Sequence, residues 1–166
     1  NIPEQVGMSE VQILNNYWIL LKYLHLPWIK VLSMPDFPTS INGLIHFYEV
    51  KRLFLFNILL LIISGLYNFF LWKRVKNTGS GWQFHTTFKR ALWVPLIILF
   101  ILVINFDPIF TLFHQVFFRN DYWIFNPSTD PIILVLPQEF FMFCFLSVFI
   151  LIELFIWILK EKTKWN

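Results

Sequence analysis

Two histidines, His46 and His114, are the residues of this sequence best placed to do chemistry. His46 lies seven residues before one long apolar run, and His114 lies eight residues after another. An imidazole near pH 7 can both accept and release a proton, so two of them in one membrane layer could act as general base and general acid. Equally, amphipathic rings favour the membrane interface, and the residue types leave both interpretations open.

Polar residues near each histidine could support such a pair. Glu49 follows His46 by three residues, so on a helix the two side chains share a face and the carboxylate could orient the imidazole. Glu49 could instead be a surface carboxylate paired with Lys51 or Arg52. Polar groups so close to lipid usually have partners inside the protein. The polar cluster that follows His114 consists of Arg119, Asn120 and Asp121.

The remaining titratable residues suggest other roles. His25 is expected at the C-terminal end of a surface helix, where it meets the helix dipole favourably, and His85 is expected to be a bystander in a basic loop. A metal site is conceivable, but no ligand spacing is diagnostic, and the serine-hydrolase, zinc-protease and nucleotide-binding motifs are absent from the sequence. The residues that could hold a metal are His46, Glu49, His114 and Asp121.

The composition requires a membrane to position these residues. Of the 166 residues, 57% are hydrophobic and only 14% are charged, against about a quarter charged in soluble domains. About 20 residues at 1.5 Å each cross a bilayer core of about 30 Å. The basic residues mostly flank the apolar runs, which argues against nucleic-acid binding. The predicted transmembrane segments are 53–72, 91–106 and 140–159.

Basic residues predict the orientation of these segments. Eight of them lie in 25 residues on one side, and five lie in 85 residues on the other. By the positive-inside rule the richer side is cytoplasmic, although Lys51 and Arg52 run against the assignment. The cytoplasmic segments are then the loop 73–90 and the tail 160–166, and the outer, interfacial segments are 1–52 and 107–139. Three crossings that start outside predict a further transmembrane helix upstream of Asn1.

The outer segments contain helix and turn signals. Ser9 and Gln12 form a capping-box pattern, and apolar residues follow at helical spacing, which predicts an amphipathic surface helix of about 16 residues. The segment 34–38, with two prolines, predicts an extended connector, and a helix then begins near Ser40 and continues into the first apolar run. The other expected elements are an interfacial helix around 110–118 and a turn-rich loop at 126–131.

Two motifs give the chain a family resemblance. Segment 38–50 resembles the motif G-x-x-H-F-x-[DE]-V of the Lit family, the lipoprotein intramolecular transacylases of Gram-positive bacteria. Segment 113–125 resembles the second motif of that family, which continues through Asp130-Pro131 to Leu136-Pro137 and Phe140-Phe141. The resemblance covers nearly the whole chain. It implies an all-α, four-helix integral membrane protein of the bacterial cytoplasmic membrane, with its active site on the extracytoplasmic side.

The resemblance also implies an activity. Lit enzymes move the sn-2 acyl chain of a diacylglyceryl-modified lipoprotein onto the α-amino group of its N-terminal cysteine, and no cofactor is expected. His46 and His114 would then be catalytic, and the supporting or substrate-positioning residues would be Glu49, Arg119, Asn120, Asp121 and Trp123. The expected partners are lipoproteins and membrane lipid. Two other classes stay open, a non-catalytic membrane assembly or sensor protein and a metal-dependent membrane hydrolase.

Overall fold

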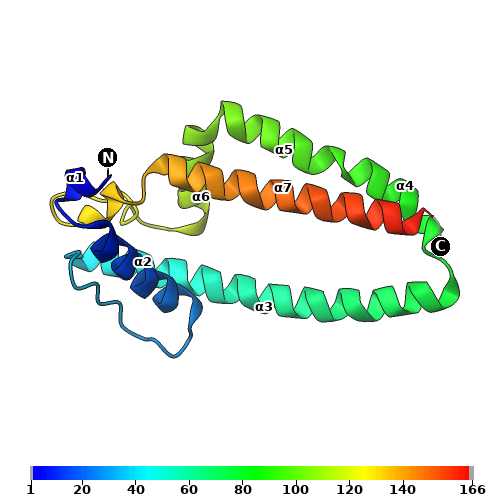
Figure 1. Cartoon of the computed structure of the whole chain (residues 1–166), viewed down its shortest axis with the longest axis horizontal. Coiled ribbons are helices and arrows are strands. Elements are labelled where there is room, and N and C mark those ends of the chain that lie inside the picture. The colour runs from blue at the N-terminus through cyan, green and yellow to red at the C-terminus, as the bar shows by residue number, and fades with distance from the viewer. Residues whose placement is uncertain (1, 165–166) are drawn as a thin grey trace. The chain divides into compact units, whose positions relative to one another are not determined.

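Residues 2–164, the part of the chain that this computed structural model describes, form helices joined by loops and contain no strand (Figure 1). Three helical stretches are long and apolar enough to cross a membrane: α3 (Ile41–Thr78), the run Trp82–Ile104, and α7 (Gln138–Thr163). The run Trp82–Ile104 consists of α4 (Trp82–Ala91) and α5 (Trp93–Ile104). The predicted all-α membrane fold is therefore confirmed.

These three stretches turn their apolar side chains outward. In the most hydropathic part of α3 and of α7, no residue is buried inside the protein. In the corresponding part of the run Trp82–Ile104, only 11% of the residues are buried. Leu61, Phe70 and Leu151 are each more than 60% exposed. A water-soluble monomer rarely exposes so much contiguous apolar surface, so lipid must cover these helices.

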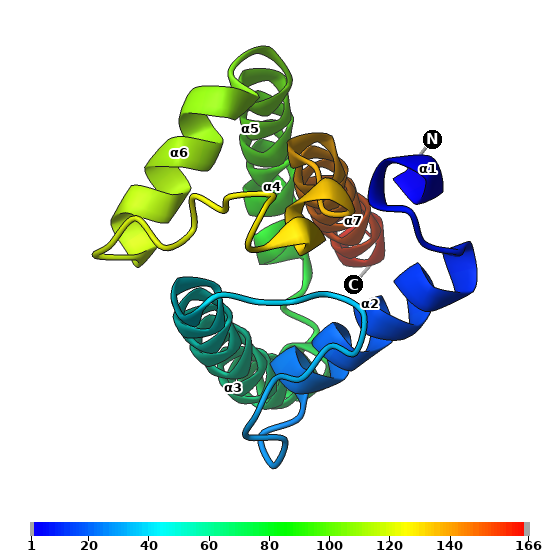
Figure 2. The ribbon, with the colours of Figure 1, turned by 90° about the vertical axis from the view of Figure 1, so that its left-hand side faces the viewer.

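The chain forms two compact units, and α3 and α6 (Phe106–Phe117) contribute to both. The first unit also contains α1 (Ile2–Val6), α2 (Glu10–His25) and the 3₁₀ turn η1 (Pro131–Leu134). In the second unit, α4 and α5 pack along α7, as Figures 1 and 2 both show. The residues of the first unit are those up to 61 with 113–137, and those of the second are 62–112 with 138 onward.

The surface helix α2 has the predicted start and length. The backbone N–H of Gln12 donates to Ser9 Oγ at 3.3 Å, and the Ser9 N–H donates to Gln12 Oε1 at 3.0 Å, which completes the capping box. The helix has 16 residues and two faces. Its buried residues are Asn16, Leu20, Tyr23 and Leu24, and its exposed large apolar residues are Val11, Leu14 and Trp18.

A reciprocal polar contact fixes the connector after α2 against the helix. Asn16 is fully buried, and its Nδ2 donates to Asp36 Oδ2 at 2.7 Å. The Asp36 N–H returns a bond to Asn16 Oδ1 at 3.3 Å. Asn16 thereby sets where the connector meets α2, and hence where the chain enters α3.

Replacing Asn16 with Ala is expected to lower the free energy of unfolding by about 1–3 kcal/mol, because the half-buried Asp36 would lose its amide partner. Asn15→Ala is the matched control, since Asn15 is the exposed neighbour on the same helix. Thermal unfolding in detergent measures both variants. Equal stability of the two would contradict this role for Asn16.

Lys51, whose charge ran against the predicted orientation, is buried in the first unit. Its Nζ donates to the carbonyl oxygens of Leu26 (2.9 Å) and Ile29, and it lies over the Tyr23 ring, 4.4 Å from the centroid. The ammonium group therefore has its partners inside the protein, where it satisfies carbonyl oxygens just after α2. This residue therefore says little about which side of the membrane the segment faces.

The basic stretch between the first two transmembrane segments is mostly helical. Helix α3 continues beyond residue 72, where the predicted transmembrane segment ends, to Thr78, and α4 begins at Trp82. Lysine and arginine are good helix formers, so the charged residues after 72 prolong the helix. Helix α3 ends before Gly79. This glycine has a φ of +62°, and a glycine in this left-handed conformation commonly terminates a helix. His85, expected to be a bystander, contacts the Lys160 carbonyl through Nδ1 at 3.0 Å and so joins α4 to α7.

Candidate active site

The structure brings His46 and His114 together within the first unit. His46 lies in the second turn of α3, and His114 lies in the last turn of α6. Their ring centroids are 6.0 Å apart, and the residues are only 6% and 9% exposed. Two imidazoles on different helices thus share one buried pocket.

Aromatic rings enclose the two histidines. Trp123 stacks on His114, with centroids 4.5 Å apart and planes 27° apart. Phe118 meets the edge of His46 at 4.7 Å and also lies 5.6 Å from His114, and Phe125 contacts His46 at 5.5 Å. We call Phe118, Trp123 and Phe125 the aromatic enclosure. The enclosure reduces the access of water to the two rings. Electrostatic interactions between the rings and a bound substrate are therefore stronger than they would be in water.

His46 is a neutral imidazole with an open nitrogen. Its Nδ1 is buried, and no residue in the described part of the chain hydrogen-bonds to it. Burial, reinforced by the nearby charge of His114, lowers the pKa of His46 from 6.5 to about 4. His46 precedes the predicted transmembrane segment 53–72 and lies outside it. A neutral ring with an unused nitrogen can receive a proton or bind a substrate donor.

Glu49 joins the two predicted motifs. Its Oε1 accepts a hydrogen bond from Asn120 Nδ2 at 2.9 Å, and Asn120 Oδ1 accepts the Tyr122 N–H at 3.1 Å. The second carboxylate oxygen, Oε2, is buried and has no partner among residues 2–164. The carboxylate therefore bonds to Asn120 and leaves His46 Nδ1 open. Lys51, one of the surface partners considered for it, is bound to backbone carbonyls instead.

The structure places the other two residues of the predicted polar cluster at the protein surface. Arg119 and Asp121 are exposed, whereas Asn120 between them is half-buried. Residues 118–124 follow α6 as a series of bends and turns, so successive side chains point in different directions. Of the predicted residues, the structure brings His46, His114 and Trp123 into ring contact and pairs Glu49 with Asn120.

Asp130 is a residue of this region that reasoning from the sequence did not single out. It is 3% exposed, and its Oδ1 accepts the Ser40 N–H at 2.8 Å, directly before α3 begins. Thr129 Oγ1 donates to its other oxygen at 2.7 Å. A carboxylate at a helix N-terminus satisfies a free backbone donor and complements the helix dipole. The signals in the sequence were its place in the turn-rich loop before Pro131 and its place in the continuation of the second family motif.

Gly43 makes room for this carboxylate. A Cβ at position 43 would overlap Asp130 Oδ1 and would lie 3.0 Å from Thr39 Cγ2, which is closer than ordinary van der Waals contact. The glycine stands three residues before His46 on α3. Its absence of a side chain thus lets Asp130 of loop 126–130 approach the first turn of α3, which lies one turn before His46.

Metal ligation was the other chemistry considered. Within the described residues, no three His, Cys, Asp or Glu side chains are grouped so that they could hold a metal ion.

Comparison with known proteins assigns the family. The model of the family described as lipoprotein intramolecular transacylase Lit matches residues 1–141. The chain belongs to the Lit family. It is therefore an acyltransferase of the lipoprotein intramolecular transacylase type, as the two motifs predicted. A search of curated proteins gives no match.

Solved structures of Lit proteins are similar to this Lit-family chain. The structure of the membrane-integral lipoprotein intramolecular transacylase Lit from Bacillus cereus is 34% identical, with a TM-score of 0.73, covering 98% of this chain and 77% of that one. Two variants of the Bacillus cereus protein, with a histidine replaced by arginine or by alanine, are 31% identical with TM-scores of 0.66. They also cover 98% of this chain, and 74% and 76% of their own.

Proposed function

We propose that this Lit-family chain moves the sn-2 acyl chain of a diacylglyceryl-modified lipoprotein onto the α-amino group of its N-terminal cysteine. The product is an N-acylated lyso-lipoprotein. The observation that carries the proposal is the pair of buried imidazoles, 6.0 Å apart inside the aromatic enclosure. The distribution of basic residues supports placing this site on the extracytoplasmic face of the cytoplasmic membrane.

The reaction is a balanced proton relay. The substrate amine attacks the ester carbonyl, the N–C bond forms, and the C–O bond to glycerol breaks. The proton lost by the nitrogen ends on the glycerol oxygen, so one imidazole takes it as general base and the other delivers a proton as general acid. Because amine and ester belong to one molecule, the protein has mainly to hold them in a reactive pose.

The low pKa of His46 suits the second half of this relay. An imidazole whose pKa is about 4 gives up a proton readily once it has received one. His46 and His114 can exchange roles in the proposal, and a transient acyl-histidine is an alternative route with the same products. Candidate donors for the tetrahedral oxyanion are Arg119, Asn120 and backbone N–H groups.

The unpartnered atoms of the pocket support binding of a polar headgroup. His46 Nδ1 and Glu49 Oε2 are buried polar atoms whose hydrogen bonds the described residues do not supply. Buried polar atoms are nearly always hydrogen-bonded in proteins, so a ligand or water is expected to complete them. An α-ammonium group carries the donors that a carboxylate oxygen lacks, and we propose that Glu49 Oε2 receives it.

The rate of acyl transfer is expected to rise with pH between about 6 and 8 and then to level off, because the nucleophile is a neutral amine with a pKa of about 7.7–8.0. Since the lowered pKa of His46 is about 4, this ring stays neutral across that range and adds no inflection. Initial rates with a diacylated lipopeptide in detergent check the profile. A rate that falls as pH rises through this range would contradict a resting neutral His46.

The experiment that tests the function is mass spectrometry of a lipoprotein's N-terminal peptide from cells with and without this protein. We expect one acyl chain to move from glycerol to nitrogen at unchanged total mass. An unchanged peptide would count against the proposal. A strong chelator is expected to leave the transfer intact, whereas a metal-dependent hydrolase would lose activity and would release a fatty acid.

A further inference from the structure

The loop that follows α2 is fixed against α3 by a buried lysine. We call this loop, residues 26–31, the tip loop. Lys51 of α3 donates hydrogen bonds from Nζ to the carbonyl oxygens of Leu26 and Ile29. Figure 1 shows the end of α2 and the loop after it next to α3. The tip loop therefore lies level with the turn of α3 that carries Lys51.

A ring contact places the end of α2 at the edge of the predicted membrane core. The rings of His25, the last residue of α2, and Phe54 of α3 meet nearly at right angles, with centroids 5.0 Å apart. Phe54 is the second residue of the predicted transmembrane segment 53–72. The end of α2 and the tip loop thus reach the level at which the lipid hydrocarbon is expected to begin.

The tip loop exposes large apolar side chains at this level. Trp28 is 71% exposed and Val31 is 76% exposed, and Lys30 between them is exposed as well. Tryptophan favours the layer between water and hydrocarbon, and a lysine there keeps its stem in the apolar layer and its ammonium group at the phosphates. The sequence has no acid in residues 11–35, so no carboxylate of this stretch opposes contact with lipid.

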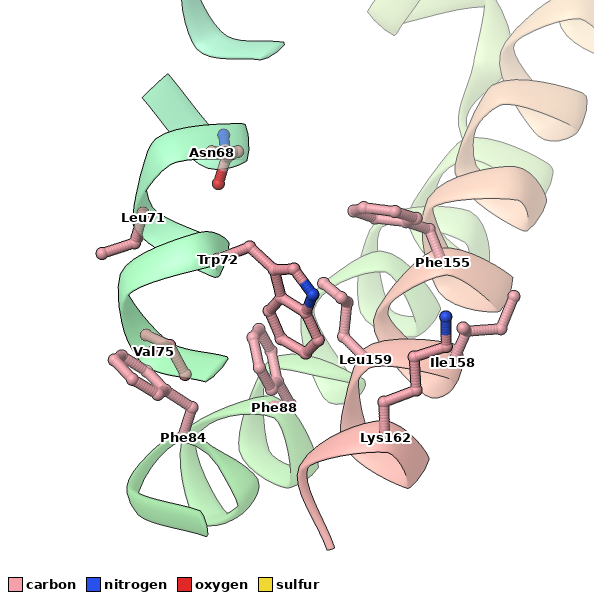
Figure 3. A pocket seen from close by; sticks show the side chains of 10 residues that line it. All are labelled: Asn68, Leu71, Trp72, Val75, Phe84, Phe88, Phe155, Ile158, Leu159 and Lys162. Carbon is pink, nitrogen blue, oxygen red and sulfur yellow. The ribbon is translucent and has the colours of Figure 1, made fainter. Parts of the chain in front are cut away.

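Trp72, at the opposite end of segment 53–72, differs from Trp28 in its surroundings. In the second unit it lines a cavity of about 300 Å³, and Figure 3 shows it pointing toward Phe155 and Leu159 of α7. Trp72 is therefore packed among side chains of the protein itself. Trp28, by contrast, leaves most of its surface uncovered by the described residues, and a place at the edge of the lipid layer suits such a ring.

The geometry points to the tip loop as an anchor that inserts into the lipid leaflet on the side of the two histidines. Trp28 and Val31 enter the apolar edge of that leaflet, and Lys30 meets the phosphates of the headgroups. The occupant of this surface is lipid because the surface continues the lipid-covered face of α3. His46 precedes Lys51 by about 7–8 Å along α3, so the anchor holds the unit that carries the histidines against the bilayer.

Depth-dependent fluorescence quenching of the full chain in phosphatidylglycerol vesicles tests the anchor. Cys144→Ser first removes the exposed native cysteine, and a nitrobenzoxadiazole label is then attached at Trp28→Cys or Val31→Cys. Quenching by nitroxide groups on the lipid acyl chains is expected to place both labels about 5–10 Å inside the headgroup boundary. Iodide in the water is expected to quench neither label.

Ser128→Cys is the matched control, because Ser128 is exposed in the same unit but lies near the start of α3. The bond from the Ser40 N–H to Asp130 holds its loop there. Ser40 precedes Leu53, the first residue of the predicted transmembrane segment, by about 20 Å along the chain of α3. Iodide is expected to quench a label at position 128, and the lipid nitroxides are expected to leave it unchanged.

A charge in the tip loop tests the insertion independently. With the label at position 28, Val31→Asp is expected to move the label out into the water, because a carboxylate is costly in hydrocarbon. Ser128→Asp is expected to leave the depth of that label unchanged.

Three results would overturn the proposal. Quenching of the labels at 28 and 31 by iodide would place the tip loop in water. A label that neither quencher reaches would indicate that a protein, or a second copy of this chain, covers the loop. An unchanged depth after Val31→Asp would show that the loop is not in contact with hydrocarbon.

Discussion

Replacing His46 or His114 with Asn is expected to slow acyl transfer by about 10²- to 10⁴-fold, because an amide keeps polarity but cannot accept and release the proton. The two rings are 6.0 Å apart in one buried pocket, so neither can take over the other's transfer without moving. The measurement is the initial rate with a diacylated lipopeptide, normalised to folded protein in the membrane. His25→Asn is the matched control, since the exposed His25 lies at the end of α2 and bonds to the Leu21 carbonyl.

The double variant is expected to be hardly slower than either single variant. Residues that act as one catalytic unit show this non-additivity, because removing one already disables the relay. If the rate loss of the double variant equalled the product of the losses of the two single variants, the two histidines would work in separate steps. A rate equal to that of His25→Asn in either single variant would remove that histidine from the mechanism.

Gly43→Ala is expected to lower the free energy of unfolding by about 1–3 kcal/mol and to reduce acyl transfer, because the new methyl group overlaps a buried contact. The methyl group would meet Asp130 Oδ1, the acceptor for the Ser40 N–H, so that bond must lengthen or break. His46 follows one turn later on the same helix, and a shift of this turn moves its ring within the aromatic enclosure.

The control for this variant stands on the same helix. Gly65→Ala adds a methyl group where nothing lies within 4 Å, and it is expected to be neutral or to stabilise α3 by about 0.5–1 kcal/mol. Thermal unfolding and lipopeptide assays on both variants give the comparison. If Gly43→Ala behaved like Gly65→Ala in both, the close approach of Asp130 would have no energetic role.

Local signals in the sequence predicted much of the fold. The capping box at Ser9 and Gln12 gave the start of α2, because its two hydrogen bonds join residues three apart. The apolar runs gave the three membrane-crossing helices, since length and hydropathy suffice for that assignment. The helix that was expected to begin near Ser40 begins at Ile41, where the proline-containing connector ends. Each of these features depends on residues close together in the chain.

Contacts between distant residues were the part that could not be predicted. Asp130 reaches across 90 positions to Ser40, and no periodicity or motif spacing reports such a pairing. Lys51 ran against the predicted orientation, and its bonds to Leu26 and Ile29 could not be predicted because they depend on how the connector folds back. Asn120 was grouped with Arg119 and Asp121 as a polar cluster, but its hydrogen bond to Glu49, 71 positions earlier, could not be read from that grouping.

A crystal structure with a non-transferable substrate analogue tests the central claim most directly. In the analogue an ether replaces the sn-2 ester of a diacylglyceryl lipopeptide, so it binds without reacting. We predict that its α-amino nitrogen and its sn-2 oxygen each lie within about 3.2 Å of an imidazole nitrogen, one on His46 and one on His114. An analogue bound with its amine and sn-2 oxygen away from both rings would contradict the account.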